Sequence, residues 1–335
     1  MRSGSTRATG PGDVVLGRES PAGKVLVVGS SNMDFVAQVA SLPRPGETVM
    51  GGKFSTHLGG KGANQAVAAA LAGAEVTFVA RVGKDPVGDQ MLASLREKGI
   101  ALGFVIRSEA NPSGVAIIMV DAQGENIIAV CSGANLELSP EDAKAAESAF
   151  AAADVLVCQL ETPMVTVRKA LALARQRGAC TVLNPAPAQQ LAGATDDLPA
   201  LLSQVDVLTP NETEAEILTG LTVRDIEEAK AAGSRLLQAG AKNVVFTLGS
   251  NGALLVSEKG SQHFPSLPVQ PLDTTGAGDA FSGALSARLA LGRPLGEAIQ
   301  FANAAAAISV TRLGAQESMP RREEVEKMLA RSSSA

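Results

Sequence analysis

The stretch DTTGAGDAFSGALSARLALG, residues 273–292, decides how the sequence is interpreted. A strand-like approach ends in Gly276-Ala277-Gly278, and a helix over 276–291 is predicted to begin there. Glycines let the backbone turn tightly and leave free N–H groups at the helix N-terminus, where the helix dipole favours anionic oxygen. Asp279 would face the same point, and a carboxylate there repels phosphate unless it has a task, such as accepting the proton of an attacking hydroxyl. The alternative is an ordinary glycine-rich turn in which Asp279 caps the helix.

A second glycine-rich segment, LGGKGANQ at residues 58–65, leads into a predicted helix. Its glycines, together with Lys61 and Asn64, indicate a close approach of the backbone to a polar ligand. A flexible loop that feeds a helix is the alternative. The segment is not a P-loop, because GxxxxGK[ST] occurs nowhere in the chain, and neither glycine-rich segment completes GxGxxG. The sequence therefore disfavours a dinucleotide-binding site.

The segment GSSNMD, residues 29–34, follows the first predicted strand. Ligands of open α/β sheets bind off the carboxyl ends of the strands. Asn32 and Asp34, one residue apart, offer donors and acceptors suited to adjacent sugar hydroxyls. An Asx-turn is the structural alternative for this segment.

Two further polar turns also follow predicted strands. In TPNETE, residues 209–214, Asn211 and Glu214 would share one face of the first helical turn, a suitable way to hold hydrated Mg²⁺ and phosphate. The turn TLGSNG, residues 247–252, suits a nucleotide. An N-capped acidic helix start and a plain β-turn are the respective alternatives.

Outside these motifs, predicted strands alternate with predicted helices. Strands are expected at Lys24–Ser31, Glu75–Gly83, Asp154–Leu160, Cys180–Asn184, Val205–Leu208 and Val244–Leu248, and helices at Lys61–Ala74, Pro86–Gly99, Ser139–Ala153, Pro163–Gly178, Glu212–Thr219, Asp225–Ala239, Gly276–Leu291, Leu295–Arg312 and Arg321–Ala330. Such alternation with short connections indicates an α/β fold with a parallel sheet covered by helices on both faces.

Two stretches, Phe35–Leu58 and Gly103–Gly133, break this rhythm. Both show β-type alternation with turn signals and no helix. In the second, a hairpin is predicted to pair Val115–Val120 with Asn126–Val130. We expect a small β-subdomain, built from two separate insertions, over the edge of the main sheet.

Composition excludes several classes of protein. Hydrophobic residues make up 45% of the 335 residues, enough for a sizeable core, and with no Trp or Tyr that core must be mostly aliphatic. The net charge of −5 argues against nucleic-acid binding. The three cysteines lack CxxC spacing, so neither a disulfide framework nor a zinc site is expected. No apolar run reaches the roughly 18 residues that span a membrane.

Residues 1–22 are rich in Gly, Ser, Arg and Pro and lack the apolar core of a secretory signal. We expect a disordered tail and a cytoplasmic protein. A transit peptide is the alternative, which Asp13 and Glu19 disfavour.

The order and joint presence of the motifs go further than any one of them. Asn32-x-Asp34, GGKGAN, QLE at 159–161, LNPAPA at 183–188, TPNETE, TLGSNG and DTTGAGDAF closely resemble the ribokinase family of sugar and nucleoside kinases. The resemblance runs from about Lys24 to Ala330. It implies a ribokinase-like three-layer α/β sandwich over 23–335, with a central, mostly parallel sheet and a small β-sheet lid formed by about 35–58 and 103–133.

The resemblance also implies a role for individual residues. Asp279 looks like the catalytic base, beside an anion hole formed by Gly276, Ala277 and Gly278. The sugar-binding positions are matched by Asn32, Asp34, Gly60, Lys61, Asn64, Glu161 and Asp279, and the nucleotide-binding positions by Asn211, Thr247, Gly249, Ser250, Gly252, Gly278 and Asn303. Glu214 matches an acidic residue associated indirectly with Mg²⁺, and the K⁺ positions are matched by Asp273, Thr275, Ser309, Arg312, Gly314 and Ser318. Asn303 departs from the family, which often has His near the adenine, and this leaves the affinity for the base open.

The implied activity is the ATP-dependent phosphorylation of D-ribose at O5, with Mg²⁺ and K⁺. The implied partners are ribose, ATP and a second copy of the chain in a homodimer through the lid, with no nucleic acid and no membrane. One rival is a kinase of the same family that acts on deoxyribose or another pentose. A non-catalytic sugar-sensing protein is a second rival, and the presence of Asp279 with its glycines argues against it.

Overall fold

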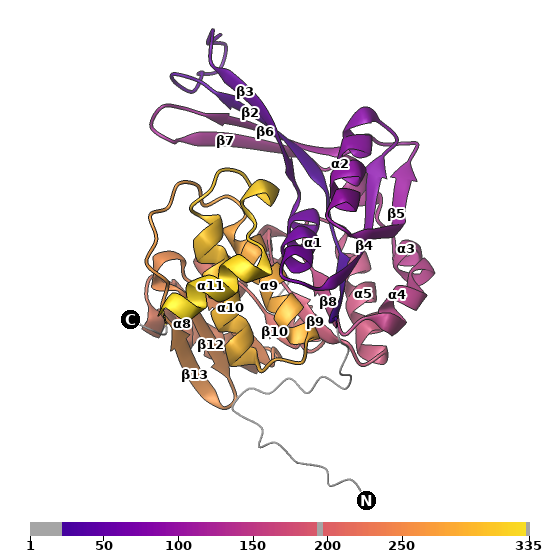
Figure 1. Cartoon of the computed structure of the whole chain (residues 1–335), viewed down its shortest axis with the longest axis vertical. Helices are drawn as coiled ribbons and strands as arrows, with labels where there is room; N and C mark the ends of the chain where they lie inside the picture. The colour runs from indigo at the N-terminus through magenta and orange to yellow at the C-terminus, as the bar shows by residue number, and fades with distance from the viewer. Residues whose placement is uncertain (1–21, 193–196, 333–335) are drawn as a thin grey trace, which may run out of the picture.

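A large and a small β-sheet organise the molecule (Figure 1). The computed structural model describes residues 22–192 and 197–332. Of the predicted tail, residues 1–21 lie outside the described part, so the prediction made for them is not tested. Within the described residues, no helix is long and apolar enough to cross a membrane.

The large sheet has nine strands in the order β13-β12-β11-β10-β9-β8-β1-β4-β5. The strands are β1 (Lys24–Val28), β4 (Glu75–Gly83), β5 (Ala101–Ser108), β8 (Val155–Cys158), β9 (Cys180–Leu183), β10 (Val207–Leu208), β11 (Asn243–Thr247), β12 (Ala253–Ser257) and β13 (Gly260–Phe264). Every pairing from β11 to β5 is parallel, and β12 and β13 are antiparallel at one edge. The predicted, mostly parallel sheet is confirmed.

Strand β1, with the sequence KVLVV, shows why the sheet is covered on both faces. Val25 and Val27 belong to one hydrophobic core and Leu26 and Val28 to another, and all four are buried. A strand buried on both faces needs a continuous apolar run, which is what the sequence has. The three-layer α/β sandwich predicted from the sequence is therefore confirmed.

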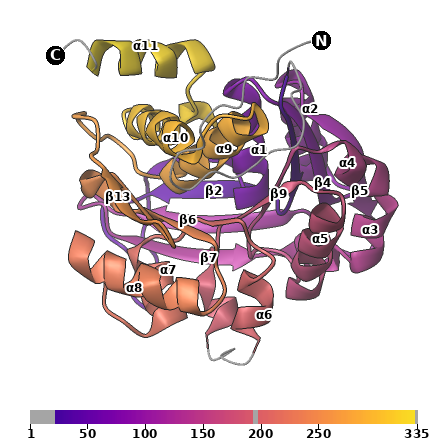
Figure 2. The same cartoon turned by 90° about the horizontal axis from the view of Figure 1, so that it is seen from below.

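Helices form the two outer layers (Figure 2). One layer comprises α1 (Lys61–Leu71), α9 (Ala277–Ala290), α10 (Leu295–Ser309) and α11 (Arg322–Ser332). The other comprises α3 (Pro140–Ala145), α4 (Glu147–Ala152), α5 (Met164–Gln176), α6 (Leu198–Leu202), α7 (Glu212–Thr219) and α8 (Ile226–Gln238). Helix α2 (Pro86–Glu97) packs beside β4 and β5. The predicted single helix over Ser139–Ala153 is instead two, α3 and α4, which meet at Ala146 although no Gly or Pro marks the break.

The small sheet, hereafter the lid, has the order β3-β2-β6-β7. Its strands are β2 (Asn32–Gln38), β3 (Lys53–Gly59), β6 (Gly114–Val120) and β7 (Asn126–Cys131). The predicted hairpin is present, with Val120 opposite Asn126. The lid projects from one end of the molecule, above α1 and α2 (Figure 1).

The limits of the lid differ from those expected. Strand β2 begins at Asn32 rather than at Phe35, so both sugar-site candidates of this segment lie on the lid. Residues 103–108, expected in the lid, belong to β5, which pairs in parallel with β4 of the large sheet. Strand β5 lies at the edge of its sheet and is half exposed, so its sequence shows the same alternation as a lid strand.

Candidate active site

The turns that follow β9, β10 and β11 meet at the carboxyl edge of the large sheet, next to the start of α9. A pocket of about 200 Å³ lies there. It is lined by Lys61, Asn184, Thr209, Asn211, Glu214, Thr247, Thr274, Gly276, Ala277, Gly278 and Asp279. The four residues that the sequence predicts to be catalytic therefore line one cavity together. They are Gly276, Ala277, Gly278 and Asp279.

Two glycines, Gly276 and Gly278, lie at the start of α9, and glycine serves a different purpose at each position. Gly276 is the N-cap in the left-handed conformation, at φ 74°, which strains any other residue. Gly278 has ordinary helical geometry, and no protein atom lies within 4 Å of the position that a Cβ would take. Because Gly278 lines the pocket, its missing side chain leaves room for a ligand close to the helix N–H groups.

Asp279 is buried, at 5% exposure, and its two carboxylate oxygens accept from two different amides of α1. Asn64 Nδ2 donates to Oδ2 and Gln65 Nε2 donates to Oδ1, each at 2.9 Å. Gly276, not Asp279, occupies the N-cap, and no side chain caps the helix. The arrangement therefore argues against the helix-capping alternative.

Three buried amides next to Asp279, namely Gln65, Gln159 and Asn184, were not among the predicted site residues. Gln159 Nε2 donates to Gln65 Oε1 at 2.7 Å, and Gln65 Nε2 donates both to Asp279 and, at 3.1 Å, to Asn184 Oδ1. Asn184 Nδ2 donates to the Thr209 carbonyl at 3.0 Å, and a carbonyl can only accept, so the direction of the chain is fixed. The motifs GGKGANQ, QLE and LNPAPA contain these residues, but their roles depend on tertiary contacts.

Asn32 and Asp34 lie on the same face of β2, because alternate residues of a strand point to one side. Gly59 on β3 makes room for this face, since a Cβ there would lie 2.4 Å from Asp34 Oδ2. Burial and the nearby carboxylate of Glu161 raise the pKa of Asp34 to about 6, against the opposing effect of His57.

Glu161 and Lys61 lie between the start of the lid and Asp279. Glu161 Oε2 accepts from Ser30 Oγ at 2.5 Å and from the Lys61 backbone N–H at 3.0 Å. Burial lowers the pKa of the Lys61 ammonium, but the surrounding carboxylates, Asp279 foremost, outweigh burial and keep that pKa above its ordinary value. Lys61 is therefore a positive charge held among acids.

Gly60 and Asn64 complete the predicted sugar positions. Gly60, at φ 85°, passes so close to Ser31 that a Cβ would lie 2.7 Å from its Cα. Asn64 uses Nδ2 for Asp279, and its buried Oδ1 has no hydrogen-bond partner among the described residues. A buried oxygen without a partner is costly. Asn64 Oδ1 is thus the acceptor left for a ligand hydroxyl.

A larger cleft of about 670 Å³ adjoins the pocket at the N-terminus of α9. The predicted nucleotide residues all line it, namely Asn211, Thr247, Gly249, Ser250, Gly252, Gly278 and Asn303. Asn303 Nδ2 donates to the Pro265 carbonyl at 2.7 Å, which holds the side chain in the wall. The cleft and the pocket share Ala277 and Gly278, so they meet at the glycine-rich turn.

Asn211 and Glu214 form a reciprocal capping box at the start of α7. Asn211 Oδ1 accepts from the Glu214 N–H at 2.8 Å, and Glu214 Oε2 accepts from the Asn211 N–H at 3.0 Å. The N-capped helix start is therefore real, and both residues also line the pocket. Burial raises the pKa of Glu214, and the Asn211 hydrogen bond offsets this only in part.

The two segments predicted to hold K⁺ lie side by side. Asp273 Oδ1 accepts from the Thr275 N–H and Oδ2 from the Gly314 N–H, each at 2.9 Å. Burial alone would raise the pKa of Asp273, but these hydrogen bonds hold it below its ordinary value. Three side chains are engaged elsewhere: Arg312 pairs with Glu324, and the Ser309 and Ser318 hydroxyls donate to nearby carbonyls.

Among residues 22–192 and 197–332, no group of three or more His, Cys, Asp or Glu side chains is arranged to hold a metal ion.

Comparison with known proteins agrees with this geometry. The model of the pfkB family carbohydrate kinases matches residues 22–322. The chain is 44% identical to a ribokinase of Haemophilus influenzae over 299 residues, which cover 89% of this chain and 95% of the relative. It is 36% identical to a deoxyribokinase of Salmonella typhi over 306 residues, which cover 91% of this chain and 98% of that relative. It also superposes on an Arabidopsis thaliana ribokinase complexed with ribose and ATP, with a TM-score of 0.82 and 31% identity over 92% of this chain and 99% of the other. The chain therefore belongs to the pfkB family of carbohydrate kinases.

Proposed function

We propose that this carbohydrate kinase transfers the γ-phosphoryl group of ATP to O5 of D-ribose, giving D-ribose 5-phosphate and ADP. One observation carries the proposal: the buried Asp279 carboxylate lies where the nucleotide-side cleft meets the small pocket. The likeness to several ribokinases supports the choice of ribose.

In the proposed mechanism, Asp279 accepts the proton of the 5-hydroxyl as the sugar oxygen attacks the γ-phosphorus in line. Asn64 and Gln65 hold the carboxylate in place from α1, so the base needs little reorganisation. The N–H groups at Gly276–Gly278 would stabilise the charge that develops on the transferring group. Lys61, positively charged and partly buried at the same pocket as Asp279, would add to this stabilisation.

Binding of the sugar is assigned to Asn32, Asp34, Asn64 and Glu161. Asp34 and Glu161 provide carboxylate acceptors, and Asn64 Oδ1 is a buried acceptor that a sugar hydroxyl would satisfy. Hydroxyl groups of a pentose match this set of acceptors. Closure of the lid over the sugar would exclude water, which otherwise competes as the acceptor of the phosphoryl group.

Two ions belong to the proposal. Glu214, with a single carboxylate at the pocket, fits Mg²⁺ held through water and substrate phosphates, because Mg²⁺ commonly uses few protein ligands. Mg²⁺ there would neutralise phosphate charge. The K⁺ site would be formed by Asp273, Thr275, Ser309, Arg312, Gly314 and Ser318, mainly through backbone carbonyls. K⁺ would order the turn that carries the anion hole.

We also infer a homodimer through the lid and a cytoplasmic location, where ATP is supplied. Large apolar side chains are about half exposed or more on lid strands β3, β6 and β7. They are Phe54, Ile117, Ile127, Ile128 and Val130. Exposed apolar surface of this kind commonly marks an interface, and a second copy of the lid would cover it.

A kinase for 2-deoxyribose or another pentose is the second candidate, supported by the likeness to a deoxyribokinase. A coupled ADP-release assay over a panel of pentoses and hexoses, with and without K⁺, separates the two. Ribose giving the highest kcat/KM supports the proposal, and another preferred sugar would replace the substrate while leaving the base in place. A protein that binds sugar and ATP without releasing ADP would instead be a sensor.

A further inference from the structure

Asn135 lies in a short 3₁₀ turn, η1 (Gly133–Glu137), where the chain returns from lid strand β7 to the body. Its side chain is buried, at 1% exposure. It forms hydrogen bonds with Ser31, just before β2, and with Asn32, the first residue of β2. We propose that Asn135 is a positioning residue that fixes the amide of Asn32, so that Asn32 presents its NH₂ group to the sugar. This inference rests on the proposed sugar-kinase function.

The orientation of the Asn135 amide is determined by the backbone of Ser31. Asn135 Oδ1 accepts from the Ser31 N–H at 2.9 Å, and Asn135 Nδ2 donates to the Ser31 carbonyl at 3.2 Å. A backbone N–H can only donate and a carbonyl can only accept. Rotating the Asn135 amide by 180° would therefore break both hydrogen bonds, and its oxygen and nitrogen are assigned without ambiguity.

This fixed amide in turn determines the orientation of Asn32. Asn135 Nδ2 also donates to Asn32 Oδ1 at 2.8 Å, so the oxygen end of the Asn32 amide faces Asn135. The NH₂ group is the other end of this amide, and it is the end left to donate to a ligand. Two residues further along the same face of β2, the Asp34 carboxylate is an acceptor. The lid therefore offers a donor followed by an acceptor, a pattern that fits hydroxyls accepting from Asn32 and donating to Asp34.

Gly114 makes room for this contact. It lies directly opposite Asn32 on β6, and a Cβ there would lie 2.3 Å from both Asn135 Nδ2 and Asn32 Oδ1. The φ of Gly114 is not in the left-handed region, so the backbone conformation does not require glycine. The Asn135–Asn32 hydrogen bond does, because any larger residue would occupy its space.

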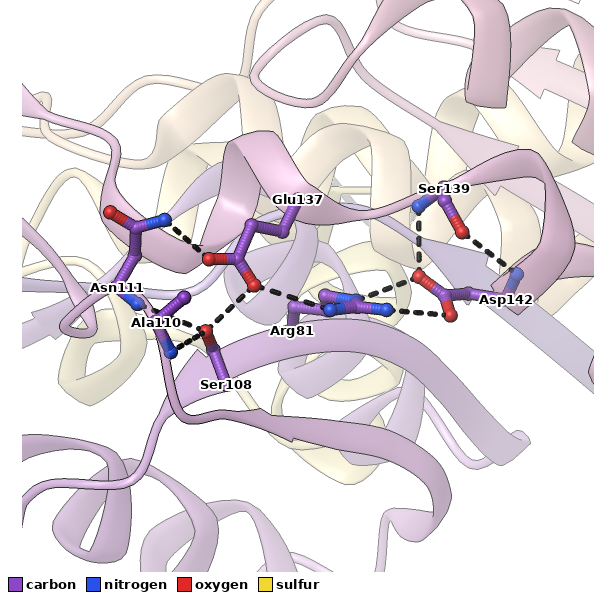
Figure 3. Close-up of polar contacts among 7 residues, drawn as sticks. All are labelled: Arg81, Ser108, Ala110, Asn111, Glu137, Ser139 and Asp142. Carbon is purple, nitrogen blue, oxygen red and sulfur yellow. Dashed lines mark hydrogen bonds and ion pairs between the residues drawn. The ribbon is translucent and has the colours of Figure 1, made fainter.

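The η1 turn is anchored to the large sheet through Glu137 and Arg81 (Figure 3). Arg81 on β4 donates from Nη1 to Glu137 Oε2 at 3.2 Å and makes a two-point contact with Asp142, at 2.7 and 3.0 Å. Glu137 Oε2 also accepts from Ser108 Oγ at 2.7 Å, at the end of β5. Asn135 is therefore carried by a turn fixed to the body, so the body sets the orientation of a sugar ligand on the lid.

Loss of Asn135 would let the Asn32 amide rotate and would weaken one neutral hydrogen bond to the sugar. We expect the dissociation constant and KM for ribose to rise roughly 3- to 10-fold on that account. KM for ATP should change by less than about twofold, because Asn135 does not line the cleft assigned to the nucleotide. A purely structural role would instead change both constants, together with kcat.

The test is a double-mutant cycle with Asn135→Ala, Asn32→Ala and the double variant. Ribose affinity is measured by titration calorimetry and turnover by ADP release. If Asn135 acts through Asn32, the double variant binds ribose no more weakly than Asn32→Ala alone. Unchanged ribose affinity in Asn135→Ala, or two effects that simply multiply, would overturn the proposal.

Asn111→Ala is the matched control. This exposed amide lies in the loop between β5 and β6 and donates to Glu137, which Arg81 and Ser108 still hold when Asn111 is lost. The variant should leave ribose affinity within about twofold of wild type. If Asn135→Ala does not fold, Asn135→Asp replaces it: its shape and the acceptor for the Ser31 N–H are kept, but an oxygen then faces Asn32 Oδ1. A ribose affinity equal to wild type in Asn135→Asp at pH 8 would also refute the inference.

Assays of the wild-type protein distinguish a failure of the proposed kinase function from a failure of the role proposed for Asn135. A wild-type protein that phosphorylates a different pentose would change the substrate, and the cycle would be run with that sugar. A wild-type protein that binds ribose normally without releasing ADP would refute the kinase activity, while the calorimetric cycle would still decide the role of Asn135.

Discussion

Asp279 in the body and Asp34 in the lid are both candidate site carboxylates, but their surroundings differ. Asp279 is buried at the start of α9 and accepts hydrogen bonds from two side-chain amides. Asp34 accepts none from the described side chains, and burial with Glu161 raises its pKa to about 6. In the proposed mechanism, this difference corresponds to a body carboxylate that is positioned in advance for chemistry and a lid carboxylate that a ligand would satisfy.

Removing the body carboxylate should have the largest effect. Asp279→Asn is nearly isosteric but cannot accept the proton, so we expect kcat to fall by at least ~10²–10⁴-fold. Steady-state ADP release measures this, and calorimetry should show that ribose and ATP still bind. A variant that keeps more than a tenth of wild-type kcat would remove Asp279 from the chemical step.

Removing the lid carboxylate should affect binding rather than chemistry. Asp34→Ala is expected to raise KM for ribose far more than KM for ATP, since each lost charged hydrogen bond is worth roughly 1.5–3 kcal/mol, about 10- to 150-fold. Initial rates measured against each substrate in turn separate the two constants. If KM for ribose stays at the wild-type value, the sugar does not lie against Asp34.

The pH dependence should also distinguish the two carboxylates. With a pKa of about 6 in the folded protein, Asp34 is ionised above that pH and accepts from sugar hydroxyls, and it is protonated below it. KM for ribose should therefore be lowest near pH 7.5 and rise as the pH falls through 6, by at most about tenfold per pH unit. KM for ATP should vary less. A KM for ribose that is flat between pH 5 and 8 would argue against this role.

Replacing K⁺ with Na⁺ or Li⁺ should change activity less than the two carboxylate substitutions do. The change should arise in the body, where the proposed K⁺ site lies. A large ion held by carbonyl oxygens of the Asp273–Thr275 turn and the 309–318 segment would order the anion hole, and Na⁺ or Li⁺ would fit less well. We expect lower kcat in either ion at constant ionic strength. Equal rates in K⁺, Na⁺ and a bulky organic cation would exclude such a site.

Features encoded locally were predictable from the sequence. The strand–helix alternation predicted helices on both faces of a parallel sheet. The DTTGAGD stretch predicted a helix start at a tight glycine turn with Asp279 close behind it, and the structure has Gly276 there in the left-handed conformation. The family and the fold are confirmed. The sugar, nucleotide and ion roles stay predictions, although the described residues bring the nucleotide candidates into one cleft.

Features that depend on distant contacts were not predictable. Gln65 meets Asp279 across 214 positions and Asn135 meets Asn32 across 103, and no local pattern marks such pairs. Residues 103–108 were assigned to the lid because an edge strand of the large sheet has the same half-buried alternation as a lid strand. Local patterns describe exposure along a strand, but not which sheet the strand joins.

The most direct test of the central claim is kcat/KM for D-ribose and for 2-deoxyribose, measured side by side at saturating ATP and K⁺. A site built to pair the 2-hydroxyl with Asn32 and Asp34 loses those bonds with the deoxy sugar, although a water molecule can replace part of them. We predict a ratio of roughly 10–100 in favour of ribose, with ribose 5-phosphate as the product. A ratio at or below one would contradict the account and identify deoxyribose as the preferred substrate.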